Sequence, residues 1–186
     1  MDLLRTEDLA PLDLQHHEER WKTQQSGEAL YLLAWQGDVV VGRVTLLFRS
    51  KYAEVTRLLG EVLEMNALEA RPQGQGIGTA TIGAAENEAA RHGASVIDLA
   101  VEVGNDGARR LYERLGYVQW GHGLVIGRWT ERDDRGVVAR EHADECFYFT
   151  KRLGREAAPW GERQSNRGRN QHRPEGWLLG RNSALE

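Results

Sequence analysis

The stretch Arg71-Pro-Gln-Gly-Gln-Gly-Ile-Gly78 decides how the rest of the chain is interpreted. A β-rich run at residues 60–70 precedes it, and residues 77–91, which follow it, are rich in alanine, which favours a helix. Glycines at alternating positions let the backbone turn tightly and present several N–H groups beside the start of that helix. Such a turn suits a phosphate or pyrophosphate group. A tight strand-to-helix turn that binds no ligand would have the same pattern.

Spacing tests which phosphate-bearing ligand the loop could hold. A Walker loop needs a lysine and then serine or threonine after its last glycine, but Gly78 is followed by Thr79 and Ala80. A dinucleotide-binding loop needs a glycine at the sixth position counted from Gly74, and that position is Thr79. The acidic residue that should end the next strand is also missing, because Asp98 lies in the middle of it. Both nucleotide-binding motifs are therefore excluded.

The pattern on either side of the loop predicts an α+β fold. In residues 95–103 every second side chain is apolar, and the side chains between them are partly apolar as well. This pattern indicates a strand that is buried on both faces, and the helix before it indicates that the strand runs parallel to residues 60–70. The expected elements are a helix from Thr6 toward Trp21, a β-hairpin at 29–49 that turns at 36–38, a strand at 60–70, a helix at 77–91, a strand at 95–103, a helix at 105–115 and two strands at 117–128 and 145–153. We expect a mixed, mostly antiparallel central sheet with helices on both faces and one parallel β-α-β crossover.

Composition narrows the class of protein. A chain of 186 residues with a net charge of −4 has room for one domain and an appendage, and its charge argues against nucleic-acid binding. A single cysteine excludes an internal disulfide and a multi-cysteine metal site, and Cys146 itself is predicted to be a buried strand residue. No apolar run approaches the ~18 residues of a membrane span, and no signal peptide is visible. We expect a cytoplasmic monomer or homodimer that binds neither nucleic acid nor membranes.

The last part of the chain differs in composition from the rest. Residues 155–186 are dominated by Asn, Gln, Gly and Arg, with Pro159 and Pro174 as breakers and no sustained helical or strand period. We therefore expect a domain at 1–154 and a polar, basic, flexible tail at 155–186. The alternative is a basic arm that docks its Gly-Trp-Leu-Leu-Gly segment onto another surface.

Two blocks of sequence together resemble the GNAT N-acetyltransferase superfamily. Arg71-Pro-Gln-Gly-Gln-Gly-Ile-Gly78 is similar to that family's acyl-CoA pyrophosphate loop, Arg/Gln-x-x-Gly-x-Gly/Ala, in both content and context. Val101-Glu-Val-Gly-Asn-Asp-Gly-Ala-Arg-Arg-Leu-Tyr-Glu-Arg-Leu-Gly-Tyr117 is similar to its strand, Asn-containing turn and Ala-x-x-Leu-Tyr-x-x-x-Gly-Tyr/Phe helix. The resemblance is strongest over residues 60–121 and extends over 29–154. Asn66 departs from it, because the family usually has an apolar residue there.

The resemblance implies acetyl-CoA as the co-substrate, and no residue spacing suggests a metal. The loop's backbone N–H groups would hold the pyrophosphate, helped by the helix dipole. Arg71 would add a positive charge or simply be solvated. Asn105 would cap the second helix or hydrogen-bond CoA. The backbone N–H of Leu68 would stabilise the oxyanion. The expected cofactor-binding residues are Leu68, Arg71, Gln73, Gly74, Gln75, Gly76, Ile77, Gly78, Thr79 and Asn105.

The expected proton donor is Tyr112. On a helix that includes Ala108, this tyrosine shares its inward face with Leu111 and Leu115, a spacing that by itself indicates a core residue. The resemblance assigns the same position to the general acid that protonates the departing CoA thiolate. A phenol with an ordinary pKa of ~10 is protonated at neutral pH and can act as this acid.

The expected base is Glu64. Alternation along its strand places Glu64, Asn66 and Leu68 on one face. Glu64 could deprotonate the amine directly or through water, or it could be a sheet-surface glutamate without a catalytic role. His122 and the His16-His17 pair are further candidates.

From these residues we predict an acetyl-CoA-dependent N-acetyltransferase that moves an acetyl group to a primary amine by direct attack in a ternary complex. The acceptor is a small-molecule amine or a protein or peptide amine, and the acidic charge of the chain suits a cationic one. A non-catalytic acyl-CoA-binding or regulatory module on the same fold is the alternative. An interaction protein that acts through its tail is a third possibility.

Overall fold

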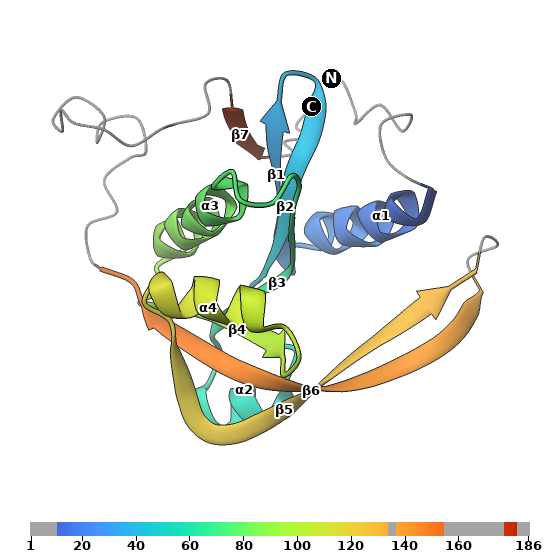
Figure 1. Ribbon diagram of the computed structural model, residues 1–186. Coiled ribbons are helices and arrows are strands. Elements are labelled where there is room, and N and C mark those ends of the chain that lie inside the picture. Colours follow the sequence, from blue (N-terminus) through green and yellow to red (C-terminus); the bar gives the residue numbers. More distant parts are fainter. Residues whose placement is uncertain (1–10, 134–136, 155–176, 182–186) are drawn as a thin grey trace, which may run out of the picture.

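The computed structural model describes residues 11–133, 137–154 and 177–181. Its elements are α1 (Pro11–Gln25), β1 (Ala29–Gln36), β2 (Val39–Leu47), α2 (Ala53–Leu59), β3 (Leu63–Ala70), α3 (Ile77–Arg91), β4 (Val96–Glu102), α4 (Asp106–Arg114), β5 (Val118–Arg132), β6 (Val138–Arg152) and β7 (Trp177–Arg181). The strands form one sheet in the order β5-β6-β4-β3-β2-β1-β7, and among them β3 and β4 are the parallel pair. This confirms the predicted fold class (Figure 1).

Helices cover both faces of the sheet, and each face has its own apolar core. Ile82 of α3 and Tyr112 of α4 belong to one buried cluster, which defines the α3/α4 face. Val55 of α2 belongs to a second cluster on the opposite face. Helix α1 covers that opposite face as well, where the rings of His17 and Tyr31 lie 5.3 Å apart between centroids. We call it the α1/α2 face.

Helix α3 lies unusually close to the sheet at Gly42 of β2. A Cβ atom at this position would lie 2.9 Å from Oγ1 of Thr81 and 3.0 Å from Cγ2 of Ile77. Both distances are shorter than normal van der Waals contact, so any larger side chain would push the helix away. Gly42 therefore sets the position of the first turn of α3, which the glycine-rich loop enters.

The parallel pairing of β3 with β4 is short. It joins Leu63–Met65 to Ile97–Leu99, and beyond this point the two strands separate. Ala67 has a φ of 52° there, and the register between β2 and β3 shifts so that Ala67 and Leu68 have no partner on β2. This is the geometry of a β-bulge, which bends its strand. The result is an opening in the middle of the sheet.

Two elements differ from the sequence prediction. Helix α2 was not predicted, and the last hairpin is longer than expected, because β5 and β6 have 15 residues each. The sequence between the two predicted strands, with its charged residues at 131–136, was interpreted as a loop. Its ends instead continue the strands: Glu131 pairs with Arg140, and His142 stacks on Trp129 and contacts Glu131. The predicted helix start at Thr6 lies outside the described residues. No helix in the described part of the chain is long and apolar enough to cross a membrane.

Strand β7 was also not predicted. Trp177–Arg181 pairs antiparallel with residues 32–36 of β1, at the outer edge of the sheet (Figure 1). It contains most of the Gly-Trp-Leu-Leu-Gly segment that the sequence singled out as a docking segment, and the surface it covers belongs to the same chain. The rest of the predicted tail lies outside the described residues. The domain boundary at Gly154 stays a prediction.

Deleting residues 177–186 is expected to lower the melting temperature by about 2–4 °C, the shift that ~1 kcal/mol produces in a domain of this size. The reason is that β1 loses the hydrogen-bonding partner on its outer edge. Thermal unfolding followed by circular dichroism measures the change. A chain that ends after Arg181 is the control, because it keeps β7. Equal melting temperatures for the two truncations would show that β7 adds no stability.

Candidate active site

A cleft of about 1110 Å³ passes through the opening between β3 and β4. On the α3/α4 face it is lined by the glycine-rich loop and by residues of α4, among them Tyr112. On the α1/α2 face it is lined by Lys51, Tyr52 and residues of the β5–β6 hairpin. The cleft therefore connects the two faces of the sheet, and the short parallel pairing is what leaves room for it.

The loop presents backbone donors to the cleft. Gly74 and Gly76 have φ values of 80° and 78°, in the left-handed region that other residues rarely adopt. The first hydrogen bond of α3 runs from the N–H of Ala80 to the carbonyl of Gly76, over 3.0 Å. The N–H groups of residues 77–79 come before it, and they have no acceptor among the described residues. They and the positive end of the α3 dipole form a site suited to an anion.

Tyr112 lies where α4 meets the cleft. It is 7% exposed, and it packs with Leu111, Leu115 and Ala108 in the core of the α3/α4 face, which confirms the predicted inward face. Its ring also makes an edge contact with Tyr117 at 5.8 Å between centroids. Burial raises the pKa of Tyr112 to about 12, so its hydroxyl is protonated at neutral pH.

Glu64 lies outside the cleft lining and is fully buried on the α1/α2 face. Its carboxylate accepts hydrogen bonds from the hydroxyls of Ser50, at 2.5 Å, and Tyr148, at 3.2 Å. Burial raises the pKa of Glu64 and raises that of Asp98, its partner on β4, to about 6. A role for Glu64 as the base would therefore require a proton relay into the cleft.

Charged and aromatic side chains gather on the α1/α2 side of the cleft. Cross-strand register sets Glu102 of β4 beside Cys146 of β6, and Asp144 follows two residues further along β6. Cys146 is 5% exposed, which confirms the predicted buried strand residue, and it also lines the cleft. Burial raises the pKa of its thiol, the two carboxylates raise it further, and the ammonium of Lys51 lowers it. These four groups therefore lie close together.

Comparison with known proteins shows which family the chain belongs to. The model of the Acetyltransferase (GNAT) family matches residues 2–117, more than half of the chain. The chain belongs to the GNAT acetyltransferase family. No curated protein matches the sequence.

Solved structures agree with this assignment at the level of the fold. Ribosomal-protein-alanine N-acetyltransferase from Brucella melitensis is 18% identical, with a TM-score of 0.53 over 75% of this chain and 78% of that one. Naa20 from Chaetomium thermophilum, solved with a bisubstrate analogue, is 19% identical, with a TM-score of 0.55 over 80% and 79%. The putative acetyltransferase yncA from Salmonella typhimurium, solved with acetyl-CoA, is 19% identical, with a TM-score of 0.50 over 77% and 76%.

In this GNAT domain most of the predicted CoA-binding residues come together. Those that line the cleft are Leu68, Arg71, Gln73, Gly74, Gly76, Ile77, Gly78, Thr79 and Asn105; Gln75 does not line it. The Arg71 side chain is 80% exposed and forms an ion pair with Glu69 at 2.9 Å. The Asn105 side chain accepts a hydrogen bond from the N–H of Ala108 at 3.0 Å, so it caps α4.

The bulge in β3 separates residues that alternation had placed together. Leu68 packs with the core cluster of Met65 and α3, whereas Glu64 bonds to residues on the opposite face. The prediction that Glu64 and Leu68 share a face is therefore wrong. The positive φ of Ala67 interrupts the two-residue period on which that prediction depended.

Sequence reasoning missed the functional candidates of the α1/α2 face. These cleft-lining residues are Lys51, Tyr52, Glu102, Trp129 and Asp144. They come from four separate segments of the chain. The one signal in the sequence that could have located them was the two-residue alternation of the hairpin strands, which continues through residues interpreted as a loop.

The predicted histidine candidates lie away from the cleft lining. His122 packs against Trp120, and His17 packs against Tyr31 under α1. The side chain of His16 lies outside the described residues. The described residues contain no group of three or more His, Cys, Asp or Glu side chains that could hold a metal ion.

Proposed function

We propose that this protein is an N-acetyltransferase that moves the acetyl group of acetyl-CoA to a primary amine by direct attack in a ternary complex. The observation that carries the proposal is that one continuous cleft passes through the sheet. It joins an anion-binding loop on one face to a polar pocket on the other, so two substrates can meet in the opening between β3 and β4. The placement of Tyr112 beside this route supplies a proton donor.

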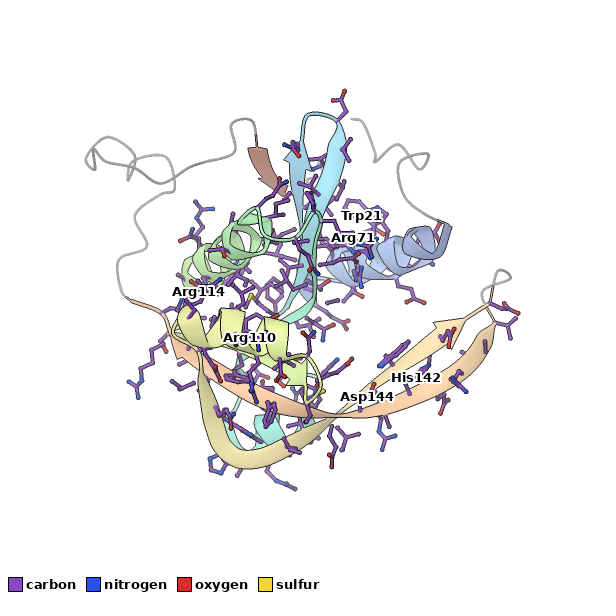
Figure 2. The ribbon with its side chains drawn as sticks, in the orientation of Figure 1. Trp21, Arg71, Arg110, Arg114, His142 and Asp144 are labelled. Atoms are coloured by element: carbon purple, nitrogen blue, oxygen red, sulfur yellow. The ribbon has the colours of Figure 1, made fainter. Side chains whose placement is uncertain are left out.

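The residues of the α3/α4 face fit CoA. The free N–H groups at the start of α3 suit its pyrophosphate. Arg110 and Arg114 of α4 line this side of the cleft and add positive charge for its phosphate groups (Figure 2). Arg71 also lines the cleft, but its side chain pairs with Glu69 and lies toward α1. Acetyl-CoA, when bound, supplies the activated thioester.

The bulge in β3 supports the role given to Leu68. This residue has no register partner on β2, and the parallel pairing with β4 ends at Met65. We assign its backbone N–H as the donor to the thioester oxygen as negative charge develops there. Tyr112 then gives its proton to the departing sulfur, which leaves as the CoA thiol. The proton that the amine nitrogen loses as the amide forms passes to solvent, and solvent reprotonates Tyr112.

The location of Cys146 provides a test of direct transfer. A thiol in the cleft could instead accept the acetyl group and pass it on, but a raised pKa disfavours the thiolate that this route needs. Cys146→Ala is therefore expected to keep kcat within about twofold of wild type, since it removes a group that takes no part. Steady-state thiol release measures kcat. A loss of several orders of magnitude, with acetyl-CoA binding retained, would indicate an acetyl-cysteine intermediate.

The proposed function itself is tested by incubating the full chain with acetyl-CoA and a panel of amines. The panel contains diamines, amino acids, aminoglycosides and peptides with free N-termini or lysines, and released CoA thiol is followed. Amine-dependent thiol release, with the acetylated amine confirmed by mass spectrometry, supports the enzyme. Calorimetric binding of acetyl-CoA with no thiol release for any amine would support a non-catalytic acyl-CoA-binding module.

A further inference from the structure

We propose that the acceptor amine carries a second cationic group, and that Trp129 and Asp144 bind this group at the hairpin end of the cleft. The inference rests on the proposed function and names the substrate class for it. The ligand is a diamine or a larger amine with a second positive centre. The amine that reacts lies at the opening between β3 and β4.

Trp129 and Asp144 form a rigid pair. The indole N–H of Trp129 donates a hydrogen bond of 2.7 Å to Oδ2 of Asp144. The ring of Trp129 stacks on His142 with centroids 3.8 Å apart and planes within 2° of each other. His142 is itself held by Glu131, at 3.3 Å. The Trp129 ring and the Asp144 carboxylate are therefore fixed before any ligand arrives, which lowers the entropy cost of binding.

This pair has a surface open to a ligand. Trp129 is 48% exposed, and both residues line the cleft. His142 covers one face of the indole, and the structure places no other ring or cation over it among the described residues. An aromatic face beside a carboxylate attracts a cation by two mechanisms, the ring quadrupole and the full negative charge.

The charges nearby leave the carboxylate available. Asp144 and Glu102 form no ion pair within the described residues. Lys51 also lines this end, and its ammonium lies 5.2 Å from the centroid of the Tyr52 ring. Arg128 lines the cleft too, but it pairs with Ala143, so alternation places its side chain on the other face of the hairpin from Asp144. Two carboxylates against one ammonium leave this end of the cleft negative.

The register of β6 gives the spacing between the two ends of the acceptor. The opening between β3 and β4 begins beyond Leu99, at the level of Ala100, whose partner on β6 is Tyr148. Asp144 lies four residues further along β6, where the hairpin leaves the body (Figure 2). At ~3.3 Å per residue this is roughly 13 Å, and a side chain at each end shortens it. A chain of about eight carbons between the two amines spans it.

The test compares octamethylenediamine with amino-octanol, which has the same length but carries a hydroxyl at its far end. We expect wild type to have a kcat/KM about 10-fold higher for the diamine, the lower limit for a charge-assisted hydrogen bond. Asp144→Asn keeps an oxygen that can accept the indole hydrogen bond and removes the charge. It should lower kcat/KM for the diamine about 10-fold and leave that for amino-octanol unchanged.

Glu145→Gln is the matched control. It is the neighbouring residue, it is exposed, it makes the same change in net charge, and it does not line the cleft. It should keep the preference for the diamine. Loss of the preference in both variants would show a general effect of charge and overturn the proposal, and so would equal kcat/KM values for the two amines in wild type.

A binding measurement separates this inference from the proposed function. Calorimetry of octamethylenediamine against the protein with CoA present requires no turnover. A 10-fold weaker Kd in Asp144→Asn, with no thiol release from wild type for any amine of the panel, would support the cation site and contradict the acetyltransferase. Thiol release by wild type, together with unchanged diamine affinity in Asp144→Asn, would support the acetyltransferase and overturn the cation site.

Discussion

Replacing Gly76 by aspartate is expected to lower the affinity for acetyl-CoA ten- to hundredfold. Gly76 caps α3 in the left-handed conformation, beside the N–H groups proposed to hold the pyrophosphate. A Cβ at this position would meet no protein atom within 4 Å, so the new side chain occupies the space that the ligand needs. Its negative charge would also compete for the helix N-terminus and repel the phosphates. Isothermal titration with acetyl-CoA measures the change.

Gly76→Asn is the control for this prediction. Asparagine has nearly the same shape and also tolerates the left-handed conformation, so both variants bear similar backbone strain. The difference in Kd between them isolates the charge. Unchanged acetyl-CoA binding in a folded Gly76→Asp variant would remove the loop from the CoA site and with it the main support for the proposed function.

Replacing Tyr112 by phenylalanine is expected to lower kcat ~10²-fold and to leave the affinity for acetyl-CoA nearly unchanged. The substitution keeps the ring that packs with Leu111 and Tyr117 and removes only the hydroxyl. A proton donor acts mainly in the transition state, so its loss lowers kcat rather than binding. The effect is at the low end for general acid catalysis because a thiolate is already a fair leaving group. Single-turnover thiol release measures the chemical step.

Tyr117→Phe is the matched control, since it deletes a buried hydroxyl that hydrogen-bonds Glu86 at 2.9 Å and does not line the cleft. It should keep kcat. The pH profile adds a second check. A pKa raised to about 12 means that Tyr112 binds its proton at any lower pH, so loss of this acid should cause no decline in kcat up to pH ~10. Wild-type kcat in Tyr112→Phe would make this residue only a part of the core.

Local sequence was sufficient for the elements that surround the loop. The glycines between residues 71 and 78 mark a strand-to-helix turn, and the alanines that follow favour α3 in any context. The helical spacing of Ala108, Leu111, Tyr112 and Leu115 likewise requires only 3.6 residues per turn to place them on one face. These features depend on neighbours in the chain, and the structure agrees with them.

The α1/α2 side of the cleft could not be predicted in the same way. Its residues Glu102, Trp129 and Asp144 come from different strands, and their meeting depends on the register of β4, β5 and β6. Charged residues in the hairpin were interpreted as a loop because their cross-strand partners are 11 to 15 positions away in the chain, as for Trp129 and Asp144. The energy of such cross-strand pairs cannot be inferred from a short stretch of sequence, because the two partners are far apart in the chain.

The sequence by itself determined the α+β fold class, the strand-to-helix turn at residues 71–78 and the inward face of Tyr112, because each follows from short-range backbone preferences and side-chain period. The GNAT family followed from the resemblance of two sequence blocks, and the family model confirms it. Only the tertiary structure decided which side of the sheet Glu64 and Leu68 lie on, and that the cleft passes between β3 and β4. The physical reason is the bulge at Ala67, whose positive φ shifts the alternation of β3 and interrupts its register with β2, just beyond the point where the pairing with β4 stops. A bulge is defined by two residues of one strand opposing one residue of its partner, so it depends on β2 as well as on β3 and has no signature within β3 alone.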